Sequence, residues 1–155
     1  KVRDLMTTQV ATLNPDDTLI KAISRLAIEN ISGAPVVDNR NHLLGILSGD
    51  DILDIILRYQ KVLENDNPGV DDIDCLKNRT DADASLKQAY DKFATTCVAE
   101  VRTTTGLTTT PDTPVIEVLK SMFTLKVNRL PVLEKGVMVG VISRSDIIFG
   151  MYRNR

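Results

Sequence analysis

The chain has 155 residues, of which 43% are hydrophobic and 26% are charged, and this composition is typical of one soluble globular domain. The net charge of −2 argues against a broad nucleic-acid-binding surface, and no apolar run approaches the roughly 18 residues of a membrane span. Two cysteines exclude a disulfide scaffold, and one histidine leaves little room for a His-based triad or a multi-histidine zinc site.

The first half of the chain reads as a strand, a helix, two strands and a second helix. Residues 10–13 form a short extended run, and residues 18–31 carry apolar side chains at helical spacing. Apolar runs at 34–37 and 43–47, separated by a polar loop, predict an antiparallel hairpin. We expect the second helix over residues 50–64.

The middle of the chain has a different composition. Residues 64–83 hold seven acidic side chains against two basic ones, so this segment carries −5 and the remainder of the chain +3. Such a segment is typical of a solvated linker. Helical spacing returns over residues 84–97.

The order of elements then recurs. Leu5–Asp38 aligns with Val101–Glu134 at an offset of 96, and the offset falls to 95 beyond a one-residue gap. Thr113 is expected to cap a helix with Pro114 at its first position, where no amide hydrogen is needed. The chain is therefore predicted to form an α/β (α+β) module of two pseudo-symmetric β-α-β-β-α units. In the second unit the strands are expected over 107–110, 130–133 and 137–142, and the second helix over 145–152.

One motif in each copy is a candidate site, because Gly-x-x-Ser-x-x-Asp occurs where a strand runs into a helix. Ser48 and Asp51 carry it in the first copy, and Ser143 and Asp146 in the second. A helix N-terminus and a serine hydroxyl are suited to phosphate, and an aspartate can accept hydrogen bonds from ribose hydroxyls. The alternative is that these residues are helix caps, which is the commoner role of serine and aspartate at such a junction.

Taken together, these motifs make the whole chain resemble a tandem pair of CBS domains, the cystathionine-β-synthase-type regulatory module. The resemblance rests on the order, spacing and duplication of short motifs, among them Val2–Thr7, Gly33–Asp38 and Gly45–Ser48 with Asp51. It implies a first motif over residues 1–64, an acidic linker with a helix over 65–97, and a second motif over 98–155.

The resemblance also implies a function, which is regulation without catalysis. CBS pairs bind AMP, ADP, ATP or S-adenosylmethionine in clefts between the two motifs, require no cofactor, and tune an attached or partner protein. The residues that would hold one ligand are Thr7, Ala11, Ser143 and Asp146, and those of the second cleft are Ser48, Asp51, Thr103 and Leu107. The backbone at Leu130 and Ala34 would lie nearby.

The two clefts are not expected to be equal. Arg129 lies where the family often has a phosphate-binding base, with Arg144 close in sequence, whereas the first copy has Gly33 and Gly49 at these positions. A guanidinium matches phosphate in both geometry and charge. Asp50 is expected to add negative charge to the Asp51 cleft. We therefore predict that the Asp146 cleft binds phosphorylated ligands more tightly.

Two other functions are weighed against this one. An interaction module could keep the fold and dimerise without a ligand. An enzyme is disfavoured, since no residue set supplies a nucleophile with a positioned base and no P-loop or dinucleotide-binding glycine pattern is present. The second helices carry strong apolar faces, so a homodimer through them is expected, in a cytoplasmic protein without nucleic-acid or membrane partners, whose regulated protein is unknown.

Overall fold

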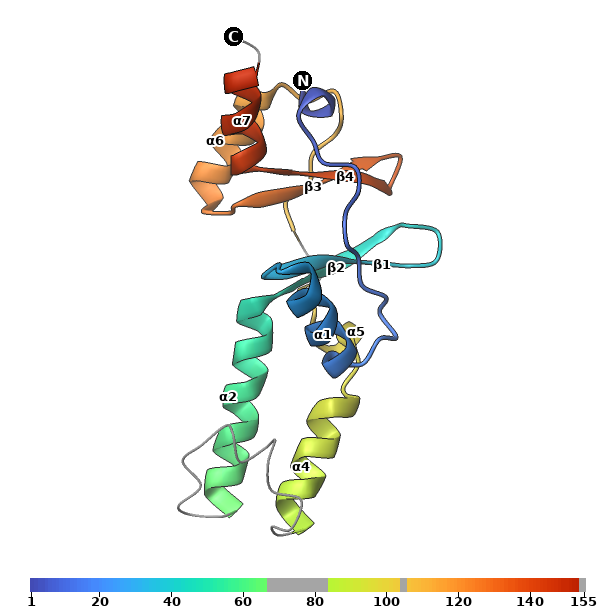
Figure 1. The fold of residues 1–155 in the computed structure, drawn as a ribbon, viewed down its shortest axis with the longest axis vertical. Helices are drawn as coiled ribbons and strands as arrows, with labels where there is room; N and C mark the ends of the chain where they lie inside the picture. The colour runs from blue at the N-terminus through green and yellow to red at the C-terminus, as the bar shows by residue number, and fades with distance from the viewer. Residues whose placement is uncertain (67–83, 104–105, 154–155) are drawn as a thin grey trace.

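The computed structural model describes residues 1–66, 84–103 and 106–153, and the predicted acidic linker lies almost entirely outside them. Its elements confirm the predicted mixture of helices and strands, and Figure 1 shows them. They are the 3-10 helix η1 (Val2–Asp4), α1 (Leu19–Glu29), β1 (Gly33–Val37), β2 (Leu43–Ser48), α2 (Gly49–Asp66), α4 (Ala84–Thr95), α5 (Val98–Val101), α6 (Val115–Leu125), β3 (Arg129–Glu134), β4 (Val137–Ser143) and α7 (Arg144–Arg153).

The two halves have the same local architecture. Strands β1 and β2 pair antiparallel from Gly33–Ser48 onward, and β3 and β4 pair antiparallel from Arg129–Ser143 onward. Each hairpin has a bulge at the same place in the repeat, after Val36 and after Val132. In Figure 1 the two hairpins lie next to each other across the middle of the molecule, with α1 and α2 on one side and α6 and α7 on the other. Duplication of sequence has therefore produced duplication of structure.

The leading strand of each copy is shorter than predicted. Of residues 10–13 only Leu13 pairs, with Val36, through its amide to Pro35 and its carbonyl to Val37. The next rungs would need amide hydrogens from Pro35 and Pro15, and proline has none. Thr109 pairs with Val132 in the same way, between the corresponding prolines of the second copy. The predicted strands 10–13 and 107–110 are therefore single parallel bridges.

The start of the α6 helix also differs from the prediction. Pro114 is its N-cap, with extended backbone angles, and the helix begins at Val115. The Thr113 hydroxyl instead accepts a hydrogen bond from the Thr110 amide, 3.3 Å away. The predicted start was wrong by one residue. Pro114 has the φ that its ring fixes, but its ψ is extended, so Pro114 is the cap and not the first helical residue.

The segment that precedes each copy packs on the other copy. Val2 and Arg3 donate amide hydrogen bonds to Thr113 and Pro111, and Thr7 pairs with Val141 of β4. In the reciprocal arrangement Val98 and Ala99 donate to Asp17 and Pro15, and Thr103 pairs with Ile46 of β2. Each two-stranded sheet is thus extended by a residue from the opposite half of the chain.

This exchange is built into two separate hydrophobic cores. Val98 is fully buried against Leu19 and Phe93 in the first core, and Val2 is fully buried among Val118 and Met122 in the second. Phe93 of α4 also meets Tyr59 of α2 edge to face, with ring centroids 5.6 Å apart. Burial of these side chains ties the two copies into one module, since each core is incomplete without the segment from the other half.

Candidate functional site

Each Gly-x-x-Ser-x-x-Asp motif forms a reciprocal cap at the start of a helix. Asp146 Oδ2 accepts hydrogen bonds from the amide and the hydroxyl of Ser143, both at 2.8 Å, and the Asp146 amide donates back to Ser143 Oγ at 3.1 Å. Ser48 and Asp51 repeat this pattern at 2.9, 2.9 and 3.2 Å. The capping interpretation is confirmed at both positions, and the serine hydroxyl proton already has an acceptor.

The second oxygen of each carboxylate faces the segment that crosses over from the other copy. Thr7 Oγ1 donates to Asp146 Oδ1 at 3.4 Å, and Thr103 Oγ1 donates to Asp51 Oδ1 at 3.3 Å. Both contacts are long and solvent-exposed, so Oδ1 is held less firmly than Oδ2. One oxygen of each aspartate builds the helix start, and the other is presented to the space between the copies.

The glycine of the motif makes room for the crossing segment. A Cβ at Gly140 would lie 2.8 Å from the carbonyl oxygen of Thr7, and a Cβ at Gly45 would collide with the carbonyl of Thr103. The glycine therefore lets the crossing backbone lie directly on the strand, which brings the threonine next to the aspartate. The same four positions in each copy thus build a Gly–Ser–Asp–Thr arrangement from two distant parts of the chain.

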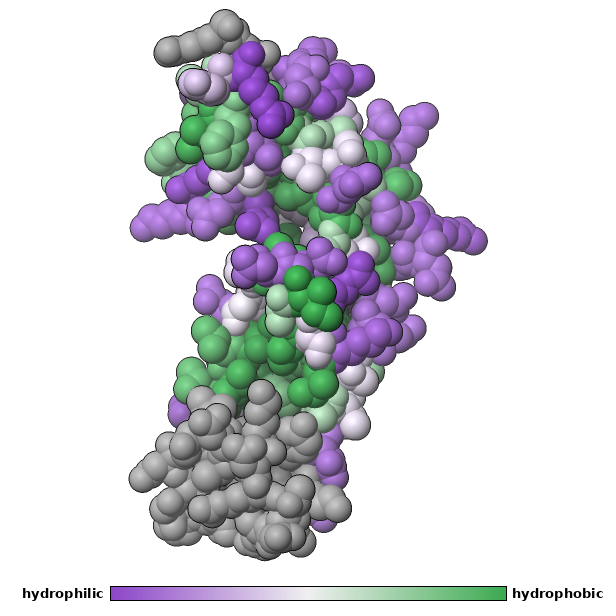
Figure 2. All heavy atoms as spheres, in the orientation of Figure 1, coloured by the Kyte–Doolittle hydropathy of each residue, from purple (hydrophilic) through white to green (hydrophobic). Residues whose placement is uncertain are grey.

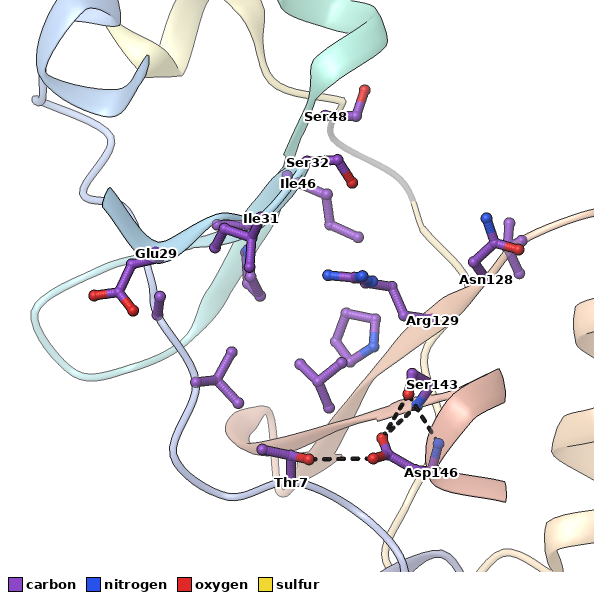
Figure 3. Close-up of a pocket in the computed structure, with 18 of the residues that line it drawn as sticks. Thr7, Glu29, Ile31, Ser32, Ile46, Ser48, Asn128, Arg129, Ser143 and Asp146 are labelled. Carbon is purple, nitrogen blue, oxygen red and sulfur yellow. Dashed lines mark hydrogen bonds between the residues drawn. The ribbon is translucent and has the colours of Figure 1, made fainter. Parts of the chain in front are cut away.

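A pocket of about 590 Å³ lies between the two hairpins. Figure 3 shows Ser143 and Asp146 on one wall, Thr7 beside them, and Ile31, Ser32, Ile46 and Ser48 on the opposite wall. The structure therefore brings predicted site residues of both motifs to one cavity. Those that line it are Thr7, Ala11, Ala34, Ser48, Arg129, Ser143 and Asp146.

Four predicted site residues do not line this pocket. Leu130 is buried in the second core, and Leu107 packs against that core. Asp51 and Thr103 contact each other at the symmetry-related position. The sequence reasoning did not name the apolar walls Ile31, Ile46 and Val141, nor Glu29. Position in the repeat could have found Ile46 and Val141, since they follow the two motif glycines.

The charged side chains near the pocket differ from the prediction in two respects. Arg129 lines the pocket, and its guanidinium extends from β3 toward Ile31 and Ile46 (Figure 3). Arg144 points elsewhere, because its Nη2 donates to the Met122 carbonyl at 3.2 Å and its guanidinium lies 5.0 Å from the centre of the Phe123 ring. Asp50 was expected to add negative charge to the Asp51 cleft. It also lines the pocket of Asp146, because this pocket reaches the start of α2.

Comparison with known proteins identifies the family. A family model described as CBS domain matches residues 2–58 and 98–152. The chain belongs to the CBS domain family. A CBS domain-containing protein of Dictyostelium discoideum is 30% identical over 148 residues, which cover 95% of this chain and 88% of that protein. The CBS domain-containing protein YhcV of Bacillus subtilis is 25% identical over 154 residues, covering 99% and 86%.

Solved CBS structures share the fold. CBSX2 in complex with AMP superposes with a TM-score of 0.72 at 20% identity, covering 99% of this chain and 96% of that one. The CBS domain pair of protein MJ0100, in complex with 5′-methylthioadenosine and S-adenosyl-L-methionine, superposes with a TM-score of 0.65 at 19% identity, covering 99% and 97%. The predicted tandem CBS pair is confirmed.

Membrane spans and clusters of metal ligands are absent from the part of the CBS module that the structure describes. Across residues 1–66, 84–103 and 106–153, no helix is both long enough and apolar enough to cross a membrane. Within the same ranges, no three histidine, cysteine, aspartate or glutamate side chains are grouped as metal ligands would be. The described lining of the cleft offers a ligand one guanidinium, carboxylate oxygens, hydroxyls, the carboxamides of Gln9 and Asn128, and apolar walls.

Proposed function

We propose that this CBS pair is a non-catalytic regulatory module that binds an adenosine nucleotide or S-adenosylmethionine in the cleft between its motifs and transmits the ligand state to a partner protein. The observation that carries the proposal is the pocket in which Asp146, Thr7 and Arg129 converge from three segments. Two structures of the same fold were solved with AMP and with adenosyl thioether and sulfonium compounds, which supports an adenosyl ligand.

In this proposal each wall has its own task. Asp146 Oδ1 accepts hydrogen bonds from the ribose hydroxyls in place of the long contact from Thr7. The start of α7 at Ser143 and the guanidinium of Arg129 receive a phosphate, since the positive end of the helix dipole and a cation both favour an anion there. The adenine packs on the apolar walls, near Thr7 and Ala11. Leu130 contributes only through its backbone.

The second cleft has the same polar geometry but lacks a base equivalent to Arg129. Asp51, Ser48 and Thr103 repeat the contacts of the first cleft within 0.1 Å. At the position of Arg129 the first copy has Gly33. A Cβ at Gly33 would lie 2.8 Å from the Leu47 carbonyl oxygen, so β1 has no room for a basic side chain there. We therefore propose that Leu107 and the Asp51 group form a weaker site for phosphorylated ligands, whereas Ala34 belongs to the lining of the Asp146 pocket.

Titration calorimetry with AMP on matched variants tests the proposal. Asp146→Asn keeps the size of the side chain but removes its charge, and we expect at least about a tenfold loss of affinity, because a hydrogen bond to a charged group contributes roughly 1.5–3 kcal/mol. Asp51→Asn, the matched variant of the second motif, is expected to leave tight binding unchanged. Equal losses in the two variants would contradict the asymmetry of the clefts.

A ligand-free interaction module is the second candidate function, and thermal unfolding separates the two. A ligand at about 100 times its dissociation constant adds about 2.7 kcal/mol to the free energy of unfolding. No rise in Tm with AMP, ATP or S-adenosylmethionine would favour the interaction module.

We also propose a homodimer and a cytoplasmic location. Figure 2 shows hydrophobic side chains over the α6–α7 end and again over α2, separated by a hydrophilic band. The exposed apolar residues of these helices include Leu53 and Leu57 on α2, Phe123 on α6, and Ile148 and Phe149 on α7. Contiguous exposed apolar surface of this kind is typical of a protein interface, and the internal repeat provides two related faces for a second copy.

A further inference from the structure

The lining of the cleft pocket carries more negative than positive charge. Among the described residues that line it, Glu29, Asp50 and Asp146 are acidic and Arg129 is the one basic residue. The lining therefore has a formal charge of −2. This balance is the reverse of what a site for a polyphosphate would need, because each added phosphate brings further negative charge.

The positive side of the pocket is sufficient for one phosphate. The guanidinium of Arg129 extends into the cavity, and the N-terminus of α7 adds a partial charge of about +0.5. A phosphate monoester carries about −1.5 to −2 at neutral pH, so these two groups roughly compensate one such group. Arg144 adds nothing to the pocket, because it donates to the Met122 carbonyl and lies over Phe123.

The two acids on the opposite wall have no basic partner. Glu29 is the last residue of α1, where the helix dipole adds negative charge, whereas Asp50 lies in the first turn of α2, where the positive end of the dipole offsets part of its charge. Neither carboxylate has an ion-pair or hydrogen-bond partner within residues 1–66, 84–103 and 106–153. Figure 3 places Glu29 across the pocket from Ser143 and Asp146. Salt screens exposed charges over about 8 Å under physiological conditions, so Asp50, which lines the cavity, adds negative potential there, and Glu29 adds less because its carboxylate points away from Arg129 in Figure 3.

We propose that Glu29 and Asp50 restrict this cleft to adenosyl ligands with at most one phosphate group, and that they disfavour ADP and ATP. The inference rests on the proposed function, because it concerns the same cleft. A ligand such as AMP places its phosphate between Arg129 and α7, whereas a second and third phosphate find no further basic side chain among the described residues of the lining. A sulfonium ligand gains from the same carboxylates.

Calorimetric titration in a buffer with EDTA, so that ATP keeps its full charge, tests the proposal. The ligands are AMP, ATP and S-adenosylmethionine, and the variant is Glu29→Gln/Asp50→Asn. We expect the wild-type chain to prefer AMP over ATP, and we expect the double variant to reduce that preference about three- to tenfold by removing long-range repulsion. The matched control is Asp91→Asn/Glu117→Gln, which removes the same charge from exposed positions that do not line the pocket.

The outcomes separate this inference from the proposed function. Binding of ATP as tight as that of AMP to the wild-type chain, or an equal change of the AMP-to-ATP ratio in variant and control, would overturn the charge selection alone. Binding of none of the three ligands would overturn the proposed function and this inference with it. Because Asp50 lies at a helix start, Glu29→Lys provides a second variant at an exposed position, and it should move the ratio further toward ATP.

Discussion

At the scale of single residues, Ser143 and Asp146 show why capping and ligand binding are not competing interpretations. The cap uses one carboxylate oxygen and fixes the side chain, and the other oxygen is left at the cleft. A side chain that is already held in place loses little conformational entropy when it binds a ligand, which favours affinity. Sequence could predict both residues, because serine and aspartate at a strand-to-helix junction have few alternatives.

Gly140 provides a test of the crossing segment. Gly140→Ala places a methyl group 2.8 Å from the Thr7 carbonyl oxygen, which is backbone and cannot move aside freely. We expect a loss of about 1–3 kcal/mol in the free energy of unfolding, as for other overpacked positions. Gly106→Ala is the control, because its added methyl would meet only the Ile46 side chain at 3.5 Å. Equal Tm values for the two variants in thermal unfolding would contradict the close approach.

At the scale of elements, the repeat pattern alone did not predict the crossing segments, although the family resemblance placed Thr7 with Asp146 and Thr103 with Asp51. The repeat suggested that each copy builds its own β-α-β-β-α unit, yet η1 completes the second core and α5 the first. Short segments such as Val2–Asp4 carry no periodicity that states which copy they pack on. Their placement depends on hydrogen bonds to residues more than one hundred positions away, such as that from Val2 to Thr113.

The ion pairs of Asp112 predict an acid dependence for this placement. Hydrogen bonds from Lys1 and Arg3 hold the pKa of the Asp112 carboxyl below its ordinary value of 3.8. Because the pKa is lower in the folded chain, the stabilisation is present above the unfolded value and is lost as pH falls through the folded one. In thermal unfolding, Asp112→Asn should therefore have a lower Tm than the wild-type chain at about pH 7, and this difference should shrink toward about pH 3.

The control for Asp112 is Asp91→Asn, an exposed acid on α4. Its Tm difference from the wild-type chain is expected to stay small and nearly constant over the same pH range. If the difference in Tm between the wild-type chain and Asp112→Asn does not change with pH, the ion pairs do not stabilise the fold through the charge of Asp112.

At the scale of the whole molecule, each hydrophobic core lies on the outer side of its hairpin, so the two hairpins face each other and the cleft lies between them. The tip of the first hairpin also meets β4, where Asn41 Nδ2 donates to the Met138 carbonyl at 2.6 Å and the Asn41 carbonyl accepts from the Met138 amide at 2.9 Å. With crossing segments and a hairpin tip joining the copies, the walls of the pocket are held in a defined relation before any ligand binds.

The exposed apolar face of α7 predicts the assembly. Light scattering after size exclusion should give the wild-type chain the mass of two copies, and Phe149→Glu the mass of one, because a carboxylate on a buried apolar interface is strongly unfavourable. Ala99→Glu, at an exposed position of α5, is the control and should leave the dimer intact. A wild-type chain with the mass of a single copy would contradict the homodimer.

Local sequence patterns were enough to predict the duplicated helices and hairpins, the Ser–Asp junctions and the position of Arg129 next to a strand. These features follow from local rules, since apolar periodicity, capping and the missing amide of proline act within a few residues. The tertiary structure was needed to show that Arg144 turns away to Phe123 and that Asp50 lines the pocket of Asp146. These contacts join distant parts of the chain through side-chain packing and charge, and no local pattern encodes them.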